Sequence, residues 1–233
     1  MSSPYIYDIL FANDQLVVIN KPYGHVVHRS KLVANADEII LQNLKEQIGQ
    51  YIYPFHRLDR KTTGVLAFGL TKEYASICAE KFREQTTTKV YYAIVRGWVI
   101  EPMLIDYPLV NEKGVSQEAL TEVVPIQQAE IPIADQRFPT SRYTLVKLLP
   151  KTGRMHQLRK HMSHIFHPII GDRPHGCNKQ NRLWKNHFDY TEMTLHARFL
   201  DLNLEGVDKI VAPFSMEFKR VAKILNFDLS NLD

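Results

Sequence analysis

The sequence predicts an α+β fold with a central mixed, mostly antiparallel sheet flanked by helices and loops. Short apolar or alternating runs, typical of strands, are mixed with segments whose apolar residues recur at helical spacing. The two kinds of segment do not follow one another as the regular strand–helix units of a parallel sheet. The chain has 233 residues, of which 45% are hydrophobic and 23% charged, an ordinary globular composition. Because nothing resembles a domain boundary, we expect one domain over residues 1–233.

The first part of the chain predicts three strands and two helices. The strands cover residues 16–19, 51–55 and 64–70, and the last is apolar enough to be buried on both faces. The helices cover residues 36–49 and 72–84, and Thr71 is a suitable N-cap for the second.

The second part begins with a strand over residues 90–99, in which Tyr91 and Tyr92 point to opposite faces. Residues 101–140 read as strand fragments and loops, and residues 143–149 as another strand. A helix is expected from about residue 155 to 166. Its inward residues would be Met155, Leu158, Met162 and Ile165.

Charge is concentrated in one part of the chain although the net charge is only +4. Residues 151–173 contain five Lys or Arg and four His against one acid, Asp172. Four cations within residues 173–187 meet no acid. This basic stretch is either a phosphate-facing surface or a solvated face.

Several classes of protein are disfavoured by what the sequence lacks. It has no Gly-rich phosphate loop and no dinucleotide fingerprint, so no nucleotide cofactor is expected. His161, His164 and His167 are not expected to share one metal ion, because their spacing turns them away from each other around a helix. With two cysteines, no signal peptide and no long apolar run, a cytoplasmic protein without a membrane segment is expected.

Three residues are candidates for chemistry. Asp59 lies in a polar loop between two apolar strands, where Arg57, Arg60 and Lys61 would favour its ionised form. Arg159 could pair with a buried carboxylate from the polar face of its helix. Tyr91 on its strand is the third candidate. Each residue also has a simpler interpretation: Asp59 as a turn former, Arg159 as a solvent-facing cation, and Tyr91 as a core tyrosine with a satisfied hydroxyl.

Four segments in order resemble the RluA family of pseudouridine synthases, over about residues 8 to 200. The first is His56-Arg57-Leu58-Asp59 with Thr62-Thr63-Gly64, in which Thr63 replaces the family's usual Ser. The others are Lys89-Val90-Tyr91-Tyr92-Ala93, Gly153-Arg154-Met155-His156-Gln157-Leu158-Arg159-Lys160-His161 and His167-Pro168-Ile169-Ile170-Gly171-Asp172.

The resemblance implies an isomerase with the pseudouridine synthase catalytic fold, no cofactor and no metal. It implies that Asp59 acts at the ribose, that Arg159 pairs with Asp59, and that Tyr91 stacks on the uracil. It also implies that Arg57 fills the space left by the flipped base. We expect further contacts to the substrate from the same motifs and the residues beside them, namely His56, Lys151, Arg154, His156, Gln157 and Lys160.

Finer features resemble the branch of the family that acts on uridine 65 of certain tRNAs. They include Asn20-Lys21-Pro22 with Val27-His28-Arg29-Ser30, Arg96-Gly97-Trp98 and Asp106-Tyr107-Pro108-Leu109-Val110. We therefore expect a monomeric tRNA pseudouridine synthase that lacks a separate N-terminal RNA-binding domain. Two alternatives remain open, a large-subunit rRNA pseudouridine synthase and a non-catalytic RNA-binding protein.

Overall fold

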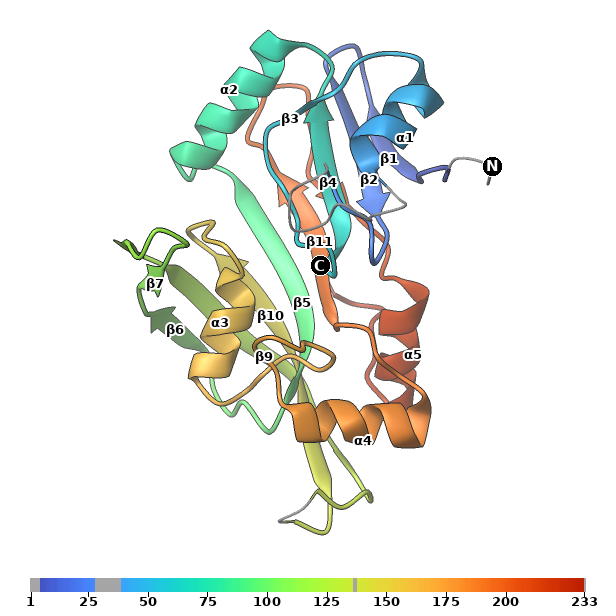
Figure 1. The fold of residues 1–233 in the computed structure, drawn as a ribbon, viewed down its shortest axis with the longest axis vertical. Helices are drawn as coiled ribbons and strands as arrows, with labels where there is room; N and C mark the ends of the chain where they lie inside the picture. The colour runs from blue at the N-terminus through green and yellow to red at the C-terminus, as the bar shows by residue number, and fades with distance from the viewer. Residues whose placement is uncertain (1–4, 28–38, 136–137, 233) are drawn as a thin grey trace. The chain divides into compact units, whose positions relative to one another are not determined.

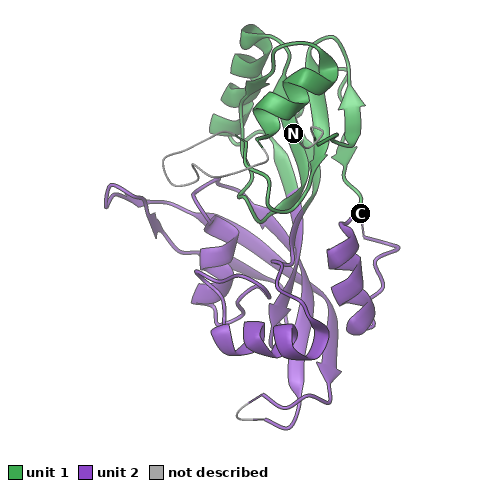
Figure 2. Ribbon diagram, turned by 45° about the vertical axis from the view of Figure 1, so that its right-hand side comes forward, with its two compact units in different colours: residues 1–89, 197–213 green, residues 90–196, 214–233 purple. Residues whose placement is uncertain are grey.

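The computed structural model describes residues 5–27, 39–135 and 138–232. The chain forms two compact units (Figure 2). Unit 1 contains Met1–Lys89 and Ala197–Pro213, and unit 2 contains Val90–His196 and Phe214–Asp233. The expected single domain over residues 1–233 stays a prediction, because compactness does not show whether a unit can fold alone.

Unit 1 is built on antiparallel strand pairs with two helices. Strand β1 (Ile9–Ala12) pairs with β2 (Leu16–Lys21), and β2 pairs with β4 (Thr63–Gly69). The short β3 (Tyr53–Pro54) also pairs with β4, and β12 (Ile210–Val211) pairs with β11 (Leu195–Asp201). All seven residues of β4 are buried, which confirms the strand predicted to be covered on both faces.

The helices of unit 1 begin and end where local chemistry allows. In α2 (Lys72–Arg83), the side chain of Thr71 accepts a hydrogen bond from the Tyr74 N–H, as an N-cap does. Helix α2 packs Cys78 into a core with residues of β2 and β4. Helix α1 (Ile40–Ile48) ends at Gly49 in the left-handed region. Of the helix predicted over 36–49, residues 36–38 lie outside the described residues, as do residues 28–30 of the motif 27–30.

Unit 2 contains a second antiparallel set of strands. Their order is β5 (Thr88–Arg96), β10 (Ser141–Pro150), β9 (Leu120–Ile131) and β6 (Met103–Asp106). The first two residues of β5, Thr88 and Lys89, belong to unit 1. A small pair is formed by β7 (Leu109–Val110) and β8 (Ser116–Gln117). The helices are α3 (Gln157–His164), α4 (Asn178–Phe188) and α5 (Met216–Ile224) (Figure 1). These helices and antiparallel strands confirm the predicted α+β class.

The prediction for helix α3 was wrong at its first turn. Met155 was expected to face inward, yet it is 43% exposed and precedes the helix. His156 has φ +56°, which is outside helical geometry, and the side chain of Gln157 accepts a hydrogen bond from the Arg154 N–H. A turn therefore occupies the positions that apolar spacing had assigned to the helix.

Among the described residues, no helix has both the length and the apolar character that a membrane-spanning segment requires.

Candidate active site

The loop that carries Asp59 joins β3 to β4 in unit 1. Leu58 is buried and anchors the loop, Asp59 is half-buried, and Arg57 is exposed. The Thr62 N–H donates to the Asp59 backbone carbonyl at 3.0 Å, which closes a turn over residues 59–62. The loop thus carries half-buried Asp59 and exposed Arg57 on a backbone that the turn constrains.

Lys21, the last residue of β2, holds this loop from beneath. Its side chain is completely buried, and its Nζ donates to the carbonyls of Pro22, Arg60 and Thr62, each at 2.9 Å. Burial lowers the pKa of Lys21 to about 7, and the nearby Asp59 carboxylate opposes that shift. Sequence reasoning missed this residue, although a lysine that ends an apolar run was a signal for a buried cation.

The backbone beside the loop leaves no room for another side chain at Gly64. Its φ is +109°, and an added Cβ would lie 2.1 Å from the Ala197 carbonyl oxygen. Only glycine combines that dihedral angle with that close approach. The start of β4 is therefore fixed against β11, and with it one end of the Asp59 loop.

His56 supports the other end of the loop. Its Nε2 accepts a hydrogen bond from the Ala67 N–H at 2.9 Å, and its ring stacks on Phe82. Burial, with repulsion from Lys89, lowers the pKa of His56 to about 3, so the ring is neutral and carries its proton on Nδ1. These contacts favour a supporting role, and the expected contact between His56 and substrate stays a prediction.

In unit 2, Arg159 lies on α3 and its side chain is only 5% exposed, which agrees with the predicted arginine that pairs with a buried carboxylate. Its Nε and Nη2 donate to the two carboxylate oxygens of Asp172, both at 2.8 Å. Sequence reasoning placed Asp172 in the basic stretch and in the motif over residues 167–172, and gave it no role of its own. The spacing of thirteen residues across a turn gave no sign of this contact, and the expected pairing of Arg159 with Asp59 stays a prediction.

Tyr91 and Tyr92 differ as strand alternation predicts. Tyr92 is 1% exposed and packs edge-on against Phe214, while Tyr91 on the opposite face of β5 is half-buried. Tyr91 is therefore only partly buried, which the core interpretation of this residue did not expect.

The other residues expected to contact substrate divide into two groups. The amide of Gln157 is buried, accepts from Thr152 and Arg154, and donates to Leu120 and Thr121, so its polar atoms are used within the protein.

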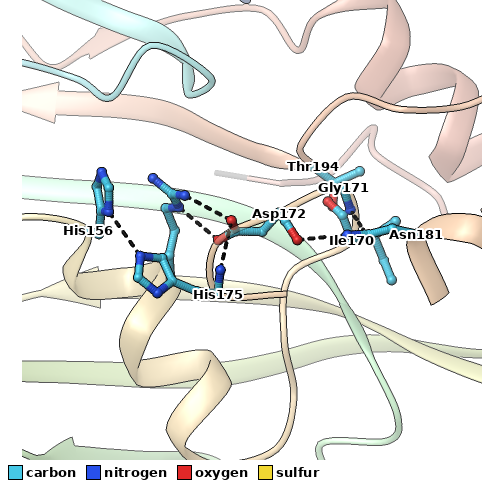
Figure 3. A network of polar contacts seen from close by, with 8 residues as sticks. His156, Ile170, Gly171, Asp172, His175, Asn181 and Thr194 are labelled. Carbon is cyan, nitrogen blue, oxygen red and sulfur yellow. Dashed lines mark hydrogen bonds and ion pairs between the residues drawn. The ribbon is translucent and has the colours of Figure 1, made fainter. Parts of the chain in front are cut away.

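Lys151 is exposed, and Arg154 and Lys160 are half-buried. The His156 ring is hydrogen-bonded to His175 at 2.9 Å (Figure 3). Their contacts with RNA stay predictions.

Helix α4 bears three exposed cations, Lys179, Arg182 and Lys185, hereafter the basic face of α4. Its opposite side buries Trp184 and Gln180, and Gln180 accepts a hydrogen bond from the Tyr143 hydroxyl. Three cations of the basic stretch therefore lie together on the exposed side of one helix.

The three histidines at 161, 164 and 167 have separate partners. His161 contacts Thr121 and the Tyr107 carbonyl, His164 stacks on the Tyr107 ring, and His167 contacts the Arg96 carbonyl. In the part of the chain that the structure describes, no cluster of metal-ligating side chains forms.

Solved structures share this fold. A human protein, RNA pseudouridylate synthase domain containing 4, superposes with a TM-score of 0.76 at 27% identity, over 96% of this chain and 95% of its own. A second human protein, RNA pseudouridylate synthase domain containing 1, superposes with a TM-score of 0.68 at 22% identity, over 97% of both chains. At that identity the likeness supports the fold alone. The architecture is thus that of the pseudouridylate synthases.

Sequence comparison makes the assignment specific. Residues 15–164, which include Asp59, Tyr91 and Arg159, match the RNA pseudouridylate synthase family. tRNA pseudouridine synthase C of Vibrio parahaemolyticus is 41% identical over 92% of this chain and 89% of its own. The protein of the same name from Vibrio cholerae is 44% identical over 82% of both chains. The chain belongs to the RNA pseudouridylate synthase family, and is therefore an isomerase.

Proposed function

We propose that this protein converts a uridine of tRNA, uridine 65 in the acceptor-side stem, into pseudouridine. Relatives that are 41–44% identical over most of the chain carry the name tRNA pseudouridine synthase C, which supports tRNA as the substrate. The position rests on the motifs of the corresponding branch. A tRNA substrate also agrees with the cytoplasmic location expected from the sequence.

Asp59 carries the chemistry in this proposal. The reaction breaks the bond between C1′ and N1, retains the uracil, and joins C5 to C1′. Positive charge that builds on the sugar during cleavage requires an ionised carboxylate, as in glycosidases. A second acid is unnecessary, because the leaving uracil is a stabilised anion that stays in the site. The observation that favours Asp59 is its loop, which Lys21 and the turn to Thr62 hold in place.

Tyr91 and Arg159 complete the proposed active site. The half-buried phenol of Tyr91 would stack on the uracil and assist removal of the C5 proton. The guanidinium of Arg159, already oriented by Asp172, would donate to the Asp59 carboxylate.

The target base must leave its stack before it can react. Exposed Arg57, two residues from Asp59, would occupy the vacated space and stack on the neighbouring bases. The basic face of α4 would bind the flanking phosphates, which position the RNA without taking part in the reaction.

Replacement of Asp59 by Asn tests the proposal. The purified Asp59→Asn protein should bind unmodified tRNA as wild type does and form no pseudouridine, because size is kept and charge removed. Exposed Asp14, in the turn between β1 and β2, provides the matched control Asp14→Asn. Retention of about a tenth of the wild-type rate by Asp59→Asn, a barrier change of only about 1.4 kcal/mol, would refute the mechanism.

Mapping pseudouridines in a deletion strain, with and without the gene restored, tests the substrate. Loss of pseudouridine at position 65 of tRNA is the expected result. If rRNA lost a pseudouridine while tRNA kept all of its own, the substrate would be rRNA and the reaction assignment would stand.

A further inference from the structure

Helix α3 is followed by a backbone conformation that is unfavourable for the residue it contains. Phe166 has φ +63°, in the left-handed region that residues other than Gly, Asn and Asp rarely adopt. The Phe166 N–H donates to the Ser163 carbonyl at 3.0 Å, and the His167 N–H donates to the Met162 carbonyl at 2.9 Å. These two hydrogen bonds form a Schellman motif, in which the residue at the position of Phe166 is usually glycine.

The same motif ends α5 with a residue that suits it. There the Asn226 N–H donates to the Lys223 carbonyl and the Phe227 N–H to the Ala222 carbonyl, and Asn226 has φ +55°. Asparagine tolerates this conformation because its short polar side chain can hydrogen-bond locally. Among the described residues, the other non-glycine residues with positive φ are also polar, namely Gln85, His156, Asp189 and Asn203. Within that part of the chain, Phe166 therefore differs from all of them in having a large apolar side chain.

Packing inside the protein does not explain the phenylalanine. The side chain of Phe166 is 85% exposed. An aromatic ring stabilises a fold by removing apolar surface from water, so a ring left in water contributes little. A residue that is both strained and unburied is a candidate for a functional role, since the fold itself gains nothing from it.

The chemistry around Phe166 favours a nucleic acid as its partner. His164, two residues earlier, stacks on the Tyr107 ring with centroids 3.6 Å and planes 19° apart, and both residues are exposed. Lys160, one helical turn before His164, is half-buried and adds a cation to that face of α3. Residues 151–171 contain four Lys or Arg and four His and no acid. Exposed aromatic rings set among cations suit the bases and phosphates of unpaired RNA.

We propose that Phe166 binds the substrate RNA directly, by stacking on an unpaired base at the end of α3. The inference rests on the proposed function and adds an RNA contact in unit 2 to that of the basic face of α4. Since every base has a π-face, the contact would contribute affinity without reading the sequence.

Replacement of Phe166 by Gly separates a binding role from a structural role, because the two roles predict opposite changes in stability. Glycine relieves the left-handed conformation and opens no core, so the Tm of Phe166→Gly should rise by about 2–4 °C. The Kd for full-length unmodified tRNA should rise about tenfold, because one base stack is lost. An unchanged Kd would overturn the proposal. A lower Tm together with weaker binding would show that Phe166 serves the fold instead.

The end of α5 provides the matched control. Asn226→Gly makes the same change in the same motif at an exposed residue, and should keep the wild-type tRNA Kd. Phe166→Tyr retains an aromatic ring and should also keep the wild-type Kd. The stacking role would be wrong if Asn226→Gly weakened binding as much as Phe166→Gly, or if Phe166→Tyr weakened it tenfold.

Salt dependence identifies the kind of contact that is lost. Stacking on a base releases no counterions, so Phe166→Gly should weaken binding by the same factor at every salt concentration. The slope of log affinity against log salt should therefore stay that of wild type. A slope reduced by about one would assign the loss to a phosphate contact and contradict the stacking role.

Analytical ultracentrifugation tests a second copy of the chain as the alternative occupant of this site. A wild-type dimer that Phe166→Gly converts to a monomer, with an unchanged tRNA Kd, would replace the RNA contact by a protein contact. Failure of wild type to modify any tRNA would refute the proposed function. The Kd comparison is then made with the RNA that wild type does modify, and an unchanged Kd for Phe166→Gly would refute this inference alone.

Discussion

Replacement of Lys21 by Met should remove the hydrogen bonds that join the end of β2 to the Asp59 loop. Met keeps the length of the side chain and removes the three hydrogen bonds from Nζ. The Arg60 carbonyl keeps a second donor, the Gly24 N–H at 3.0 Å. The carbonyls of Pro22 and Thr62 lose the bond from Nζ.

The magnitude follows from two opposing terms. Carbonyls that lose their donor in a buried site cost about 1–3 kcal/mol each, or roughly 2–6 kcal/mol for the two. Burial of a methionine in place of an ammonium recovers part of this, because the cation is costly to desolvate. At a pH below about 7, where Nζ carries the three protons that it donates, we expect a net loss of about 3 kcal/mol in the free energy of unfolding. The single-turnover rate should fall about 10²-fold as Asp59 loses its fixed position.

Urea unfolding and single-turnover assays measure the two effects, with Lys72→Met at the exposed start of α2 as the matched control. The pH dependence adds a third readout. The folded pKa of Lys21 is lowered to about 7 from 10.5, so between these pH values the unfolded chain binds the extra proton. Wild-type stability should therefore gain a rising contribution with pH across that window, which Lys21→Met lacks. A variant as stable and as active as wild type would refute the supporting role of Lys21.

Three further predictions concern pH, base flipping and RNA binding. Because the folded pKa of His56 lies near 3, below its unfolded value of 6.5, stability should fall as pH decreases between them, by at most about 1.4 kcal/mol per pH unit; His56→Gln should flatten that slope in urea unfolding. Arg57→Ala should slow modification of a folded stem far more than that of a flexible single strand, and equal losses would remove Arg57 from the flipping role. Replacing the three cations on the basic face of α4 should weaken tRNA binding and reduce the slope of log affinity against log salt by about one per lost phosphate contact; an unchanged slope in filter binding would show a face exposed only to solvent.

The sequence alone predicted the elements whose signals are local. The seven buried residues of β4 and the Thr71 cap of α2 lie where apolar runs and capping chemistry placed them. The alternation of Tyr91 and Tyr92 also follows from strand geometry alone. The sequence also indicated the family, because the motifs that identify it are contiguous segments of the chain.

Other features depended on contacts between distant parts of the chain. Apolar spacing placed Met155 in helix α3, which in fact begins at Gln157. Spacing does not reveal the turn before the helix, in which the Gln157 side chain accepts a hydrogen bond from the Arg154 N–H. Helices α4 and α5 and strand β11 were not predicted. Trp184 packs against Tyr143, and Phe218 against His196, and both partners are distant in sequence.

For the candidate active site, the sequence by itself predicted which side chains take part in the reaction, because Asp59, Tyr91 and Arg159 lie within contiguous motifs. Only the tertiary structure decided what supports them. Lys21 at the end of β2 binds the Arg60 carbonyl in the Asp59 loop, although the two residues are 39 positions apart in the chain. Asp172 binds Arg159 across a turn. A carboxylate or an ammonium chooses its partner by distance in space and by burial. Neither quantity exists until the chain has folded.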